Sequence, residues 1–104
     1  GKAITTDSAS TLADGLAVRK PDSDALQYIL RGVERVVEVS EQDLNLAIQA
    51  IFLDTHNVSE GAGAASLAGL MKEKDRQMGK RVSIILSGGN IDTLTLMSAL
   101  SLNF

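Results

Sequence analysis

The spacing of apolar and polar side chains predicts helices that alternate with strands. Positions three and four apart indicate a short helix over residues 23–32 with one buried stripe, formed by Leu26, Ile29 and Leu30. The valine-rich residues 33–39, with polar side chains at alternate positions, predict a strand. The apolar residues 82–86 are typical of a second, buried strand.

The clearest element is a helix over residues 40–55. Ser40 is a favoured N-cap residue, and Asp43 stands where the partner of a capping box belongs. A helical period then marks one apolar face, made of Leu44, Ala47, Ile48, Ile51 and Phe52. The small residues 61–70 open a further helix that runs to about residue 74, and Asp92 caps a last one.

These elements together predict an α/β fold in which helices flank a sheet. The chain has 104 residues, enough for one domain. Residues 1–9 are small and polar without any period, so we interpret them as a linker or tail. Residues 10–104 then form the single domain.

Composition excludes several classes of function. Ten Lys and Arg against 13 Asp and Glu give a net charge of −3, which excludes nucleic acid as the main partner. Without cysteine and with one histidine, the chain has no thiolate nucleophile, and we expect no metal site. No apolar run approaches the roughly 20 residues that span a bilayer. We therefore expect no membrane association and a cytoplasmic location.

Two glycine-bearing motifs are the candidates for chemistry. The Ser-Gly-Gly-Asn motif of residues 87–90 follows a predicted buried strand, and ligands bind at such strand ends in open α/β sheets. It is either a backbone nest for an anion or a tight turn without a ligand. Glu60 precedes the Gly-Ala-Gly motif of residues 61–63. Its carboxylate either stabilises the start of a helix or faces a ligand.

Four phrases of the sequence occur in a suggestive order. They are Thr-Leu-Ala-Asp-Gly-Leu-Ala-Val at 11–18, Val-Val-Glu-Val-Ser-Glu at 36–41, Ser-Glu-Gly-Ala-Gly-Ala-Ala at 59–65 and Leu-Ser-Gly-Gly-Asn-Ile-Asp at 86–92. Together they resemble the carboxyl-terminal part of serine/threonine dehydratases. These are pyridoxal-phosphate enzymes of fold type II, in the tryptophan synthase β-like family, which also includes serine racemase.

The resemblance implies a fold, a cofactor and a reaction. The fold is a three-layer arrangement of a sheet with flanking helices, part of the large domain of a fold type II enzyme. The cofactor is pyridoxal 5'-phosphate, and the reaction converts L-threonine to 2-oxobutanoate, or L-serine to pyruvate, with release of ammonia. The implied partners are a small amino-acid substrate, the remainder of the same catalytic polypeptide and further copies in a homo-oligomer.

The resemblance also implies roles for particular residues. Ser87 would hydrogen-bond the pyridine nitrogen, Glu60 would lie near the ring, and the backbone at Gly15 would pass its 3-hydroxyl side. Gly88 and Gly89 would keep the turn clear of the ring. A neutral hydroxyl can donate to an unprotonated ring nitrogen, whereas a carboxylate would hold that nitrogen protonated. This suits loss of the β-hydroxyl, but it does not separate elimination from racemisation.

Two parts of such an enzyme have no counterpart in the sequence. The family carries its Schiff-base lysine and its glycine-rich phosphate loop upstream of the matching region. The lysines of this chain stand in other contexts; they are Lys2, Lys20, Lys72, Lys74 and Lys80. We therefore expect an inactive fragment without a catalytic residue. It should also expose a strand edge or an apolar face that favours self-association.

Two alternatives remain open at the level of sequence. Within the family, the chain could come from a serine racemase or a threonine synthase-like enzyme. From another class, it could be a non-catalytic module that binds a ligand at residues 87–90.

Overall fold

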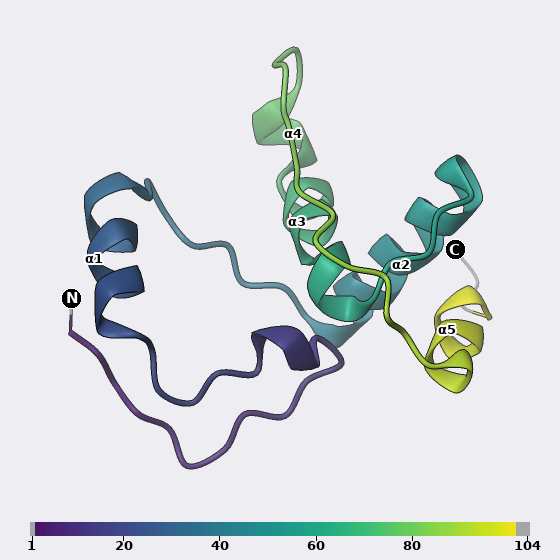
Figure 1. Ribbon diagram of the computed structural model, residues 1–104. Coiled ribbons are helices and arrows are strands. Elements are labelled where there is room, and N and C mark those ends of the chain that lie inside the picture. The colour runs from purple at the N-terminus through teal and green to yellow at the C-terminus, as the bar shows by residue number, and fades with distance from the viewer. Residues whose placement is uncertain (1, 102–104) are drawn as a thin grey trace.

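The computed structural model describes residues 2–101 as a set of helices joined by extended segments (Figure 1). No strand occurs within that range. In chain order the elements are η1 (Asp14–Leu16), α1 (Ser23–Gly32), α2 (Glu41–Thr55), α3 (Gly61–Lys72), α4 (Lys74–Gln77) and α5 (Thr93–Leu100). Each of these helices is too short or too polar to cross a membrane.

Helix α2 begins where the sequence predicts. The backbone N–H of Asp43 donates to the Ser40 hydroxyl at 3.1 Å, and the Ser40 N–H donates to the Asp43 carboxylate at 2.8 Å. These reciprocal bonds form the predicted capping box and satisfy donors that the first turn leaves without partners. The helix ends at His56, which adopts a left-handed conformation with φ 57°.

Replacing Ser40 by alanine should lower the free energy of unfolding by about 1 kcal/mol at neutral pH, because the cap is lost. The backbone and hydroxyl bonds from Ser40 lower the pKa of Asp43. A lowered pKa stabilises the fold above the unfolded value, and this stabilisation is lost as the pH falls below about 4. The difference between variant and wild type should therefore narrow in acid.

Urea denaturation at a series of pH values measures this difference. Ser98→Ala is the matched control, because Ser98 is an exposed helical serine whose hydroxyl makes no hydrogen bond to a described residue. The control should retain wild-type stability. A Ser40→Ala variant as stable as wild type at neutral pH contradicts the capping argument.

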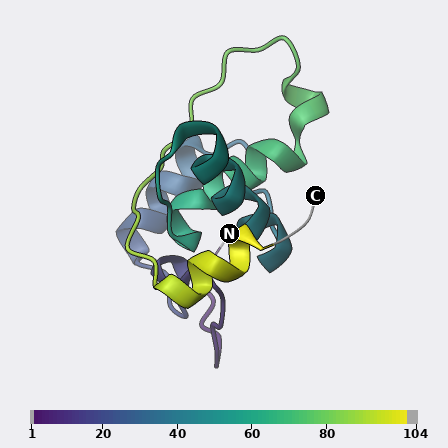
Figure 2. The same cartoon turned by 90° about the vertical axis from the view of Figure 1, so that its right-hand side faces the viewer.

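Helices α2 and α3 form the core, and α5 packs against α2. Figure 2 shows α5 in front of these two helices. The core is contributed by η1's flank and these three helices, as Ala13, Leu44, Ala47, Ile48, Ile51, Ala64, Ala68 and Ala99. The predicted apolar face of α2 is confirmed, except that Phe52 is only partly buried. Alanines on α3 let its backbone approach α2 closely.

The predicted strands at residues 33–39 and 82–86 are wrong for this chain as it stands. Both segments are extended, but neither is a strand. A strand needs hydrogen bonds to a neighbouring strand, and the described chain supplies no neighbour. Apolar side chains of both segments consequently face outward: Val36 and Ile85 are each 78% exposed. The structure thus has the predicted exposed apolar face, but the three-layer sheet is not confirmed.

Helix α1 forms as predicted, but its apolar stripe is not buried. Asp22 caps it by accepting from the N–H groups of the first turn at 3.0 and 2.9 Å. Ile29 and Leu30 are nevertheless 46% and 49% exposed. Figure 1 shows α1 apart from the other helices, and it contacts none of them in the described part of the chain. The amphipathic pattern predicts that a helix buries one face, but not which segment covers it.

A small ion-pair network ties the extended segment 33–40 to the end of α3. The Arg35 guanidinium donates to both oxygens of Glu73, with Nε at 3.1 Å from Oε1. This pairing lowers the pKa of the Glu73 carboxyl. The Lys72 ammonium donates to the Glu38 carbonyl at 2.8 Å. Residues far from one another in sequence are thereby held at one side of the helical core.

Candidate functional site

The structure brings three of the four phrases into one close-packed junction. The first turn of α3 lies directly on the segment before η1. A Cβ added at Gly61 would come within 2.7 Å of the Leu12 carbonyl oxygen, and one at Gly15 within 3.1 Å of the Ala62 methyl. Only a residue without a side chain at Gly61 allows this approach.

The turn at residues 87–90 packs on the other side of the same helix start. The backbone N–H of Glu60 donates to the Gly88 carbonyl at 3.1 Å. A Cβ at Gly63 would overlap that carbonyl oxygen, and a Cβ at Gly88 would overlap the Glu60 carboxylate. A Cβ at Gly89 would lie 2.5 Å from the Val58 carbonyl oxygen. These glycines are therefore needed for the close approach of two backbones.

Ser59 is a structural residue of this junction that the sequence analysis gives no role. Its side chain is fully buried, and its hydroxyl lies 3.0 Å from the Glu60 carbonyl and 3.4 Å from the Gly88 carbonyl. The hydroxyl donates toward these two oxygens and so links the start of α3 to the turn. A serine directly before the Glu-Gly pair is the only sequence signal for this contact.

The four predicted site residues occupy different parts of the junction. The Glu60 carboxylate lies against Gly88, so these two are together. Gly15 is exposed and rests on Ala62, one residue beyond Gly61. Ser87 is also exposed, and its hydroxyl makes no hydrogen bond to any residue that the structure describes. That hydroxyl remains available to a ligand beside the glycine turn.

A polar cavity of about 250 Å³ lies where the phrases meet. Its walls include Thr11, Asp14, Glu60, Asn90 and Asp92. One of these carboxylates already has a partner: Asp92 caps α5 by accepting from the Thr95 N–H at 3.0 Å, which lowers its pKa. The cavity is therefore built from side chains on the 11–16 loop, the α3 entrance and the α5 entrance.

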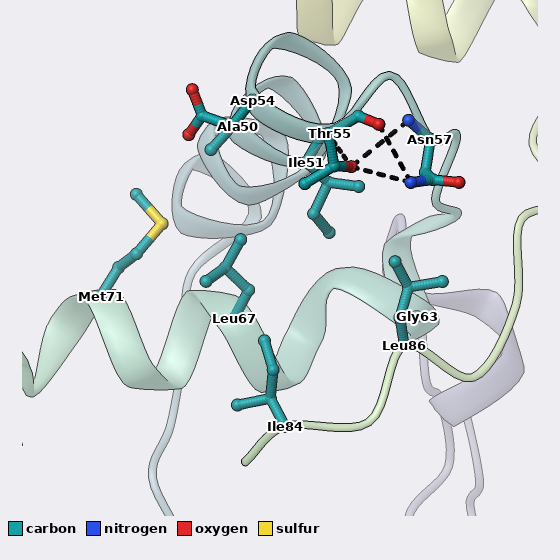
Figure 3. Close-up of a pocket in the computed structure, with 10 residues that line it drawn as sticks. All are labelled: Ala50, Ile51, Asp54, Thr55, Asn57, Gly63, Leu67, Met71, Ile84 and Leu86. Atoms are coloured by element: carbon teal, nitrogen blue, oxygen red, sulfur yellow. Dashed lines mark hydrogen bonds between the residues drawn. The ribbon is translucent and has the colours of Figure 1, made fainter. Parts of the chain in front are cut away.

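A larger apolar cavity of about 580 Å³ lies between α2, α3 and the extended segment 84–86 (Figure 3). Leu67 and Met71 of α3 line it together with Ile84 and Leu86. Asn57 and Thr55, joined by hydrogen bonds of 3.1 Å, border it at the end of α2. None of the four predicted site residues lines this cavity.

The donor groups fit one edge of a pyridine ring, which tests the cofactor implied by the resemblance. The Ser87 hydroxyl is neutral, exposed and without an internal partner, as an acceptor nitrogen requires. The glycine backbones beside it leave the turn free of bulky side chains. Across residues 2–101, no three His, Cys, Asp or Glu side chains are grouped to hold a metal ion.

Comparison with known proteins gives the family. The family described as "Pyridoxal-phosphate dependent enzyme" matches residues 1–88. An L-threonine ammonia-lyase of Geobacter sulfurreducens is 40% identical over 96 residues, which are 92% of this chain and 24% of that protein. An L-threonine ammonia-lyase of Thermotoga maritima is 38% identical over 88% of this chain and 23% of that protein. The chain thus spans about a quarter of the length of these relatives.

Solved structures match the same region. A threonine deaminase from the organism abbreviated T.th. superposes with a TM-score of 0.81 at 28% identity, covering 88% of this chain and 31% of that one. Serine racemase from Dictyostelium discoideum superposes with a TM-score of 0.72 at 30% identity, covering 80% of this chain and 28% of that one. The chain therefore shares its fold with a part of each of these two proteins.

Proposed function

The chain belongs to the pyridoxal-phosphate dependent enzyme family, and from this premise we propose that it is the carboxyl-terminal part of an L-threonine/L-serine ammonia-lyase. The names of the relatives support this choice of reaction. By itself the chain lacks a lysine in the context that the reaction needs, so activity belongs to the complete polypeptide.

The observation that carries the proposal is the junction of residues 11–16, 58–63 and 87–90. Segments far apart in the sequence meet there through glycine contacts and the Glu60–Gly88 bond. Such a convergence at a polar cavity is the arrangement expected of a ligand site built from several loops. A set of unrelated turns would not need three close backbone approaches at one helix start.

Each residue at the junction has a distinct proposed task. Pyridoxal phosphate, when bound, supplies the electron sink for bond breaking at the substrate α-carbon. Ser87 donates a hydrogen bond to the ring nitrogen without protonating it. Glu60 borders the ring, and the Gly15 backbone borders its 3-hydroxyl side. Gly88 and Gly89 keep the turn free of side chains that would occupy the space of the ring.

The proposal also accounts for the two extended segments. We assign residues 33–39 and 82–86 to the three-layer sheet of a fold type II large domain, whose other strands come from the rest of the polypeptide. The exposed Val36 and Ile85 side chains support this assignment, because a completed sheet would cover them. A homo-oligomeric assembly and a cytoplasmic location complete the proposal.

The complete polypeptide should release ammonia and a 2-oxo acid from L-threonine and L-serine only when pyridoxal phosphate is present. A coupled assay for each 2-oxo acid measures this activity. Chiral analysis of the remaining serine tests the racemase alternative, which the serine racemase superposition favours. Formation of D-serine without ammonia contradicts the lyase, and phosphate binding without any turnover indicates the non-catalytic module.

A further inference from the structure

Glu41 makes two contacts that the start of a helix does not require. The Thr11 hydroxyl donates to its Oε1 at 2.5 Å, and the Leu12 backbone N–H donates to its Oε2 at 2.7 Å. Both oxygens of one carboxylate therefore hold a segment that lies about thirty residues earlier in the chain. Hydrogen bonds to a charged acceptor are stronger than neutral ones.

The segment held by Glu41 leads directly into the candidate site. The Thr11 hydroxyl also accepts from the Ala13 N–H at 3.1 Å, so the bonds continue to a buried residue. The backbone at Leu12 and Ala13 then rests on Gly61, and the next turn places Gly15 on Ala62. A shift of residues 11–13 would move the whole η1 turn relative to the start of α3.

No other hydrogen bond in the described chain joins residues 11–18 to one of the other helices. Packing on α3 restrains the segment in one direction only, because the Asp14–Leu16 turn is exposed on its outer side. The two bonds to Glu41 supply the lateral restraint. Glu41 thus fixes the register of the loop against both α2 and α3.

We propose that Glu41 is a positioning residue that holds the Gly15 turn in place as one wall of the cofactor site. It acts through Thr11 and Leu12 and does not touch the ligand. The identity of the ligand rests on the proposed function, whereas the hold on residues 11–13 is a property of this chain.

Three substitutions separate this role from a simple charge at the start of α2. Glu41→Gln keeps the length of the side chain: its carbonyl can accept from the Leu12 N–H, and its amide can donate to the Thr11 hydroxyl. Glu41→Asp keeps the negative charge that favours a helix start, but it is one methylene too short to reach both groups. Glu41→Ala removes both properties.

The experiment uses the complete polypeptide loaded with pyridoxal phosphate. Hydrogen exchange at the Leu12 amide should become about tenfold faster in the Ala and Asp variants, and the dissociation constant for pyridoxal phosphate should rise by a similar factor. The Gln variant should remain within about threefold of wild type in both measurements. Thr11→Val, combined with Glu41→Ala, should add little to the single substitution, because both remove one interaction.

Either of two results would overturn the positioning role. One is an Asp variant like wild type beside a Gln variant like Ala, which would mean that charge alone matters. The other is Leu12 exchange that none of the variants changes. If the wild-type polypeptide binds no pyridoxal phosphate, the proposed function fails instead, and Leu12 exchange still decides the role of Glu41.

Discussion

Replacing Gly63 by alanine should destabilise the protein by about 1–2 kcal/mol and displace the turn at residues 87–90. The added methyl group would overlap the Gly88 carbonyl oxygen and lie 2.8 Å from the Ser59 hydroxyl oxygen. Gly63 is buried in a helix, where alanine alone would gain roughly 0.5–1 kcal/mol. Steric overlap outweighs that gain, because the opposing atom is backbone and no side-chain rotation relieves it.

Gly69→Ala is the matched control on the same helix. A Cβ at Gly69 meets no atom within 4 Å in the described chain, so the substitution should stabilise by up to about 1 kcal/mol. Gly88→Ala should fall between the two, because the atom it meets belongs to the flexible Glu60 side chain. Thermal or urea denaturation of the three variants measures the order. Equal stability of the Gly63 and Gly69 variants would contradict the close-approach argument.

The sequence predicts the helices well because their signals are local. Ser40 and Asp43 are three residues apart, and they recognise one another through the first turn of α2 whatever surrounds it. Asp92 caps α5 in the same local way. The strands at 33–39 and 82–86 are not predicted correctly for this chain, because a strand depends on a partner that the pattern does not identify. The exposed stripe of α1 has the same cause.

The candidate site is predicted in part, for a comparable reason. The glycine motifs identify Glu60 and Gly88 as neighbours of interest, and the structure places them in contact. Ser59 and Glu41 are missed in their actual roles, because each acts on a segment about thirty residues away. Glu41 is readily interpreted as a charge at a helix start, and only the coordinates show that it accepts two hydrogen bonds from residues 11 and 12.

Substitutions of Ser87 should alter cofactor binding and catalysis without changing stability. Ser87 is exposed and its hydroxyl makes no hydrogen bond within residues 2–101, so folding does not depend on it. In the proposed enzyme, Ser87→Ala loses one neutral hydrogen bond to the ring nitrogen. The dissociation constant for pyridoxal phosphate should then rise by about five- to tenfold.

Ser87→Asp should have the larger effect on rate. A carboxylate beside the ring nitrogen favours its protonated form and so strengthens the electron sink beyond what β-elimination needs. We expect ammonia release from L-threonine to slow on the order of 100-fold, the scale on which single well-placed hydrogen-bonding groups affect turnover. Ser83→Ala, an exposed serine of the same extended segment, should leave both stability and rate unchanged. Wild-type rates in Ser87→Asp, or a fall in its melting temperature that matches the fall in rate, would contradict a contact between Ser87 and the cofactor.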